Sequence, residues 1–358
     1  MELKKPSKII LKPLLLAMAV LFTFMACSEN PSTSHDAIIS NNEVESQANL
    51  ATQSNPNVVE ITAEHQGDDY IFTLSEYEIS SGWTTFKLNN DLDTHVHFAY
   101  FAKVPDGAKN GAEGAEDELL DYWIQHVTKP FQFFMDGLIP GKEPNPDDAP
   151  TKYDFFPPWF FEATPSGGPG FTGGMTSSET TIYLEEGEYI VECYVKNSDG
   201  DFHSYKGMIE LLTVNGESSY TQEPAATTEL TISTNGIEFD RHISAGEHVV
   251  KVNFEDQTTY DHLLGHDVHL IRLDTGTSVA EVGKWMNWMD PDGLVSSSNS
   301  LGPATFLGGV QTMTAGSSAY FHVELEPGRY AWVSEIPDPH SNQMLDVFNV
   351  PRGQAVGR

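Results

Sequence analysis

The sequence predicts an all-β protein built from two tandem β-sandwiches. Short runs rich in β-branched and aromatic residues, such as 58–63, 70–74 and 83–88, alternate with polar turn residues. Regularly spaced short strands of this kind are typical of a sandwich. The second observation is that the same series of runs returns in the C-terminal half of the chain. Because a whole set of elements repeats, we expect two copies of one domain.

The first copy is expected over residues 57–215. Its remaining strands are predicted at 96–101, 180–184, 189–194 and 208–214. Between them, residues 113–137 carry large apolar side chains at roughly helical spacing and predict a short helical insertion. Residues 138–174 are rich in proline, glycine and aromatic residues, which indicates a long loop covering the sandwich.

The internal repeat is clearest at one predicted hairpin. Residues 184–193 read LEEGEYIVEC, and residues 325–334 read LEPGRYAWVS. The strand that begins at His266, the helical run 279–289, and the pair His340 and Met344 also parallel segments of the first half. We therefore expect a second sandwich over residues 228–350, with its own short helical insertion and with Ser334 in place of Cys193.

The N-terminus has the pattern of an export signal. Four lysines precede the apolar run 14–22, which ends in small residues at Ala26 and Cys27. The segment Phe24-Met25-Ala26-Cys27 resembles a bacterial lipobox, and this implies cleavage after residue 26 and lipid attachment to Cys27. The polar residues 27–56 indicate a flexible tether. We expect a protein anchored by lipid to a membrane of the bacterial cell envelope, on the periplasmic side or at the outer-membrane surface.

The charge of the chain excludes one class of partner. It has 52 acidic against 19 basic residues and a formal net charge of −33. Such a surface repels polyanions, so nucleic acid is not expected as a partner. The sequence also lacks a nucleophile triad, a phosphate loop and a nucleotide-binding fingerprint.

The candidate functional residues surround a single cysteine. If Cys27 is acylated, Cys193 has no cysteine left to pair with, and it is either an inert buried thiol or a metal ligand. His203 and Met208 follow it, and His95 and His97 lie on an early predicted strand. A thiolate, imidazoles and a thioether form the donor set that suits copper.

A histidine on an early strand, followed much later by Cys and His-x4-Met, resembles the cupredoxins, the family of plastocyanin, azurin and pseudoazurin. The resemblance implies Greek-key sandwiches and a copper ion held by one early histidine with Cys193, His203 and Met208. His95 and His97 have the same parity on their strand, so the sequence does not choose between them. Nine residues separate Cys193 from His203, more than is usual in small blue copper proteins, and we expect this loop to bulge.

The resemblance implies outer-sphere transfer of one electron to or from a redox partner protein. An oxidase or nitrite-reductase activity is not expected, because those enzymes need a histidine beside the copper-bound cysteine, and Cys193 is flanked by Glu192 and Tyr194. The second sandwich should lack such a centre, since serine is a poor copper ligand. The alternative function is a metal-free binding or structural module displayed at the cell envelope.

Overall fold

The computed structural model describes residues 57–67, 69–91, 95–108, 118–150, 156–260, 263–296 and 302–352. All of them belong to one compact unit, Ser54–Arg358. The predicted export signal, the acylation of Cys27 and the tether fall outside the described residues. Within the described ranges no helix combines the length and the apolar character that a membrane span requires.

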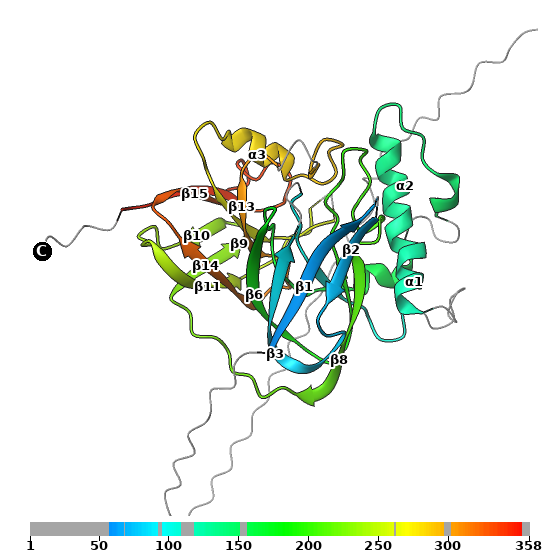
Figure 1. Cartoon of the computed structure of the whole chain (residues 1–358), viewed down its shortest axis with the longest axis horizontal. Coiled ribbons are helices and arrows are strands. Elements are labelled where there is room, and N and C mark those ends of the chain that lie inside the picture. Colours follow the sequence, from blue (N-terminus) through cyan, green and yellow to red (C-terminus); the bar gives the residue numbers. More distant parts are fainter. Residues whose placement is uncertain are drawn as a thin grey trace, which may run out of the picture. The chain divides into compact units, whose positions relative to one another are not determined.

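The first sandwich has two layers that share one strand (Figure 1). In one layer the strand order is β2-β1-β3-β6, and in the other it is β3-β8-β7-β4-β5. The change of layer within β3 occurs at Gly82, whose φ of +136° favours glycine. The strands are β1 (Asn57–Gln66), β2 (Asp69–Leu74), β3 (Glu78–Asn90), β4 (Tyr100–Lys103), β5 (Thr164–Pro165), β6 (Thr176–Leu184), β7 (Gly187–Glu192) and β8 (Ile209–Ser218).

The core of this sandwich follows from alternation along its strands. In β1 the side chains of Val59, Ile61 and Ala63 are fully buried, and those between them are partly or fully exposed. β2 buries Tyr70 and Phe72 in the same way. Each large apolar side chain removed from water contributes about 1.5–3 kcal/mol, which fixes the face that each strand turns inward.

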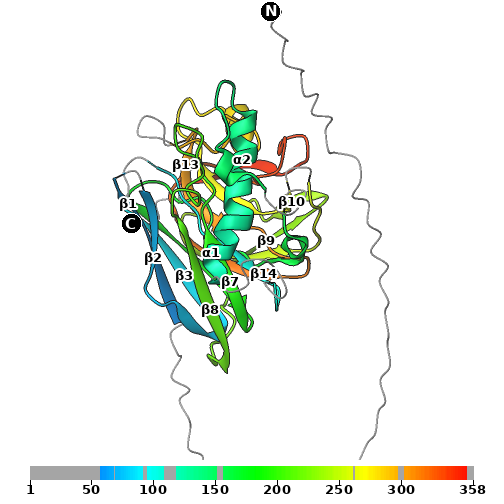
Figure 2. The same cartoon turned by 90° about the vertical axis from the view of Figure 1, so that its right-hand side faces the viewer.

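The predicted helical insertion is present. It consists of α1 (Leu119–Trp123), a π-helical turn (Ile124–Thr128) and α2 (Lys129–Leu138), which run one after the other along the side of the molecule that Figure 2 presents. The predicted covering loop follows, and it includes two 3-10 turns, Pro146–Asp148 and Pro158–Glu162.

The second sandwich repeats the plan. One layer has the order β10-β9-β11-β14, and the other has the order β13-β12-β15-β16. Its short helix α3 (Val279–Trp285) begins at Ser278, whose hydroxyl accepts a hydrogen bond from the Glu281 amide. The all-β class with two sandwiches and a helical insertion in each is confirmed. The strands are β9 (Thr228–Ser233), β10 (Gly236–Phe239), β11 (Gly246–Phe254), β12 (Val268–Arg272), β13 (Thr305–Val310), β14 (Ser318–Leu325), β15 (Gly328–Val333) and β16 (Leu345–Val350).

The two sandwiches are joined through their sheets. Strand β14 pairs antiparallel with β6, with Phe321 opposite Thr180, so one sheet of 12 strands continues through both halves. In the covering loop, Gly170 donates its amide to the carbonyl of Gly309 in β13. The domain limits 57–215 and 228–350 stay a prediction, because the two halves pack as one unit.

Candidate metal centre

Three donor atoms converge in the interior of the first sandwich. The Cys193 Sγ lies 3.8 Å from Nδ1 of His97 and 3.8 Å from Nδ1 of His203, and the two Nδ1 atoms are 3.2 Å apart. All three side chains are fully buried. The residues come from distant parts of the sequence, so the fold creates this cluster.

Backbone hydrogen bonds hold each of the three residues in place. His97 and Thr172 of the covering loop exchange two bonds, from the His97 amide at 3.1 Å and to the His97 carbonyl at 2.7 Å. The Cys193 amide donates to the carbonyl of Met208, and the Cys193 carbonyl accepts from the amide of Ser204. Side chains on a backbone paired in this way keep their positions without help from a bound ligand.

The nine residues between Cys193 and His203 form a closed hairpin, which accounts for the bulge that the spacing predicts. The His203 amide donates to the Val195 carbonyl at 2.8 Å, and the Asn197 amide donates to the Asp201 carbonyl at 2.9 Å. The Asn197 side chain also accepts from two amides of the turn. The hairpin returns the chain to its starting point, so the longer loop still places His203 beside Cys193.

Met208 lies beside these residues through its backbone. Its amide donates to the His203 carbonyl at 2.9 Å, its carbonyl accepts from the Cys193 amide, and its side chain is fully buried. The role of its thioether as a weak axial ligand stays a prediction.

The structure separates the two early histidines. Nδ1 of His97 faces the cysteine, whereas Nε2 of His95 lies 3.3 Å from the hydroxyl of Tyr70, and the His95 and His97 rings are 6.1 Å apart. Tyr70 in turn stacks on His203 with 4.0 Å between ring centroids. His97 is therefore the candidate ligand, and His95 belongs to the layer of rings around the centre.

The three donors are uncharged when no cation is present. Burial raises the pKa of the Cys193 thiol to about 12. Burial, followed by the neighbouring histidines, holds the pKa values of His97 and His203 well below 6.5. A protonated imidazolium is thereby excluded at neutral pH, and both rings keep a nitrogen lone pair for a ligand bond.

The cluster fits a metal ion by distance and by chemistry. Metal bonds of about 2.0–2.1 Å to nitrogen and about 2.3 Å to sulfur allow two bound donors to lie up to about 4.1 or 4.4 Å apart. The separations of 3.2 and 3.8 Å fall within these limits. Neither Nε2 atom of His97 and His203 has a hydrogen-bond partner among the described residues. Both rings can therefore carry their proton on Nε2 and leave Nδ1 free to bind.

The corresponding place in the second sandwich lacks the donor set. The Ser334 amide donates to the Met344 carbonyl just as the Cys193 amide does to Met208, and strand register places His266 at the position of His97. The Met344 amide, however, bonds to Pro339, so Pro339 stands where the first sandwich has His203. The predicted match of His340 with His203 is wrong by one residue, and His340 is exposed.

A second buried cluster, Asp267, His269 and Glu335, was missed in the sequence. Its only sequence signal is an aspartate within an apolar strand. The Phe171 amide donates to Nδ1 of His269, so the proton is on Nε2, which lies 3.2 Å from Asp267 Oδ2. A protonated Nε2 has no lone pair to share with an ion held by Asp267 and Glu335. The cluster is a hydrogen-bonded network rather than a metal site.

We expect Glu335→Gln to remove a pH dependence of stability. Burial first, and then Asp267, raise the pKa of Glu335 well above 4.5, with smaller opposite effects from Tyr194 and Lys196. A raised carboxyl pKa contributes stability that is complete below about pH 4.5 and is lost as pH rises through the folded-state pKa. Relative to the wild type, the variant should become progressively more stable as the pH rises from about 5 to about 8.

Urea unfolding at the two pH values measures this gain. The exposed Glu238, replaced by glutamine, is the matched control and should follow the wild type. An equal pH response in both variants would show that Glu335 ionises normally in the folded protein.

Some solved structures are similar to this chain, at low sequence identity. No family model and no curated protein matches the chain. Among solved structures, auracyanin from Roseiflexus castenholzii is 15% identical, with 45% of this chain and 97% of that chain covered and a TM-score of 0.22. Auracyanin B is 17% identical, with 37% and 94% covered and a TM-score of 0.25. Copper nitrite reductase from Nitrosomonas europaea is 11% identical, with 84% and 96% covered and a TM-score of 0.22.

At TM-scores of 0.25 and below, these similarities carry no argument about this chain. Any conclusion about function therefore depends on the side chains of this chain.

Proposed function

We propose that the protein is a lipid-anchored, exported copper protein that transfers single electrons. His97, Cys193 and His203 would hold the ion, with Met208 as the axial ligand. The observation that carries the proposal is the convergence of one sulfur and two nitrogens within 3.2–3.8 Å in a fully buried place. Soft sulfur combined with imidazole suits copper better than calcium or magnesium, which prefer oxygen ligands.

Copper bound to such a set would supply a one-electron couple between Cu(I) and Cu(II). The backbones of His97, Cys193 and His203 are each hydrogen-bonded, which favours a ligand arrangement that changes little between the two redox states. The protein also excludes water, since none of the three side chains is accessible to solvent. Both properties favour electron transfer over binding and turnover of a substrate at the ion, so we propose a redox partner protein and no enzymatic activity.

The location is part of the same proposal. It rests on the export signal and the lipobox around Cys27. Fractionation of bacteria that express the full chain or its Cys27→Ser variant tests it, and the variant should move from the membrane fraction to the soluble fraction.

The alternative is a metal-free module displayed at the cell envelope. The second sandwich supports it, because the same plan is built there with Ser334 and Pro339 in place of two donors. In that case the Cys193 thiol stays protonated inside the core, as its raised pKa allows.

Titration of the purified full-length protein with Cu(II) distinguishes the two functions. We expect one equivalent to produce an intense absorption in the red part of the visible spectrum, which arises from the bond between copper and thiolate. Cys193→Ser should lose the absorption entirely and still fold, because serine occupies the same place in the second sandwich. The exposed His242, replaced by alanine, is the control. A colourless wild-type protein would favour the metal-free module.

A further inference from the structure

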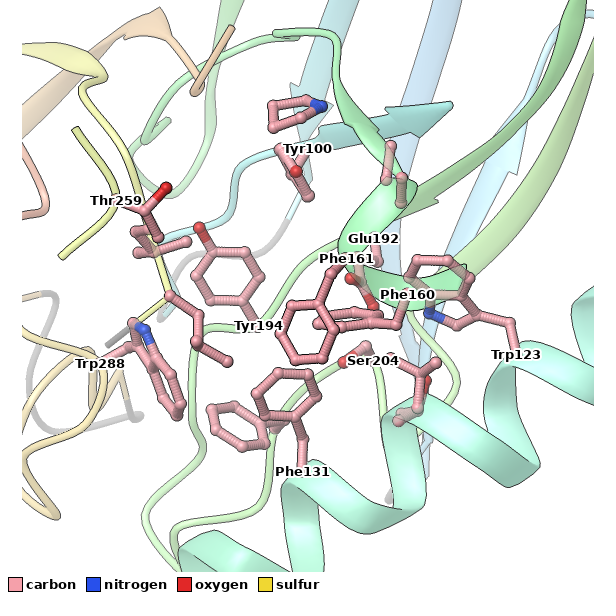
Figure 3. Close-up of a pocket in the computed structure, with 18 residues that line it drawn as sticks. Tyr100, Trp123, Phe131, Phe160, Phe161, Glu192, Tyr194, Ser204, Thr259 and Trp288 are labelled. Atoms are coloured by element: carbon pink, nitrogen blue, oxygen red, sulfur yellow. The ribbon is translucent and has the colours of Figure 1, made fainter. Parts of the chain in front are cut away.

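An aromatic pocket lies beside the candidate metal centre. Its volume is about 300 Å³, within the range of small-molecule sites. Helices α1 and α2, the 3-10 turn Pro158–Glu162, strand β4 and two loops of the second sandwich contribute to its wall. Figure 3 shows its largest side chains converging on one space, namely Tyr100, Trp123, Phe131, Phe160, Tyr194 and Trp288.

The pocket and the metal centre use opposite faces of the same stretch of chain. Glu192 and Tyr194 line the pocket, as Figure 3 shows, whereas Cys193 between them faces His97 and His203. Alternation of side chains along an extended backbone produces this division. None of the proposed copper ligands lines the pocket, so binding there does not require the ion.

One polar group in the pocket wall lacks a partner. The Thr128 hydroxyl belongs to a side chain that is 3% exposed, and it has no hydrogen-bond partner among the described residues, whereas the indole N–H of Trp123 interacts with the Glu192 carboxyl group. A buried polar group without a partner costs about 1–3 kcal/mol. A hydroxyl can donate to an oxygen atom of a ligand, which would supply the missing partner.

The pocket opens to solvent and disfavours anions. Phe161 and Leu263 line it and are 53% and 40% exposed, which is high for large apolar side chains and marks the mouth. Of the described lining residues, Glu192 is the one with a carboxyl group, and none is a lysine or an arginine. The net charge of −33 further disfavours a negatively charged ligand.

We propose that this pocket binds an uncharged aromatic molecule of one or two rings that carries a hydroxyl or carbonyl oxygen. The rings would pack between aromatic side chains such as Phe131 and Tyr194, and the oxygen would accept a hydrogen bond from the Thr128 hydroxyl. This inference is independent of the proposed electron transfer, because no copper ligand takes part.

Calorimetry with the copper-free full-length protein and 2-naphthol tests the proposal. We expect binding of one molecule per chain, and no binding of the anion 2-naphthoate. Thr128→Val keeps the shape of the wall and removes the hydroxyl, and it should weaken 2-naphthol binding about fivefold. Ala163→Phe fills the pocket and should abolish binding.

Four results would overturn the proposal. They are no binding of 2-naphthol to the wild type, equal binding of 2-naphthol and 2-naphthoate, unchanged binding by Ala163→Phe, and unchanged binding by Thr128→Val. Thr128→Val removes an unpaired hydroxyl and so does not endanger the fold, which keeps the test informative if Ala163→Phe is unstable.

Discussion

Replacing His97 by glutamine should abolish the red absorption of the copper-loaded protein, and replacing His95 by glutamine should leave it intact. Nδ1 of His97 lies 3.8 Å from the cysteine sulfur, whereas Nε2 of His95 lies beside the Tyr70 hydroxyl. Mutation of a residue that only contacts a metal ligand typically weakens metal binding about 10- to 100-fold. Loss of one of the three strong ligands should therefore weaken copper binding more than about 100-fold. Parallel Cu(II) titrations of the two variants measure the difference.

The His95→Gln and His97→Gln variants serve as controls for each other. Both histidines are buried within one short segment, so a general disturbance of the fold would affect the variants alike. Loss of the absorption in His95→Gln, with retention in His97→Gln, would exchange the roles of the two residues and contradict the assignment.

The positions of the strands could be predicted because one face of each strand is apolar. β1 and β2 alternate buried and exposed side chains as their sequences do, and the helical run at residues 119–138 shows a different period. The choice between His95 and His97 could not be made in this way. Residues two positions apart on an extended strand share a face, and only the packing of Tyr70 and His65 around the rings separates them.

The loop between Cys193 and His203 shows a second limit. Its length predicts a bulge, but spacing does not reveal that the Asn197 side chain and Gly200, with its φ of +79°, close the segment into a hairpin. In the second sandwich the structural equivalent of His203 lies one residue earlier than the sequence alignment predicts. It is Pro339 and not the expected His340. Ligand spacing along a chain therefore predicts a centre only when the turn that joins the ligands is known.

Buried polar residues were the least predictable. Asp267, Lys196 and Glu335 are all fully buried, although residues of these types are usually exposed. Each has hydrogen-bond partners far away in the sequence, such as Tyr194 for Glu335 and the carbonyl of Trp288 for Lys196. The pairs of Glu335 with Tyr194 and of Lys196 with Trp288 join the two sandwiches, so neither repeat alone carries a signal for them.

Lys196 connects the two sandwiches through both its backbone and its side chain. Its amide donates to the Leu294 carbonyl at 2.9 Å, and its carbonyl accepts from the Ser296 amide at 2.8 Å. Its ammonium group donates to the carbonyls of Trp288, at 2.9 Å, and Asp290, at 2.6 Å, with a longer contact to Pro291. Burial lowers the pKa of Lys196 to about 7, against opposite effects of the nearby acidic residues. Below this pH the three N–H groups of its ammonium have acceptors on one loop.

We expect Lys196→Met to destabilise the protein by about 3 kcal/mol, because methionine keeps much of the apolar volume but leaves these carbonyls without donors. Urea unfolding of the full-length protein measures the loss of stability. The control is Lys284→Met at an exposed position of α3, and its free energy of unfolding should stay within about 0.5 kcal/mol of the wild-type value. A loss below about 1 kcal/mol would mean that water replaces the ammonium group at this loop. The junction would then depend mainly on the pairing of β6 with β14.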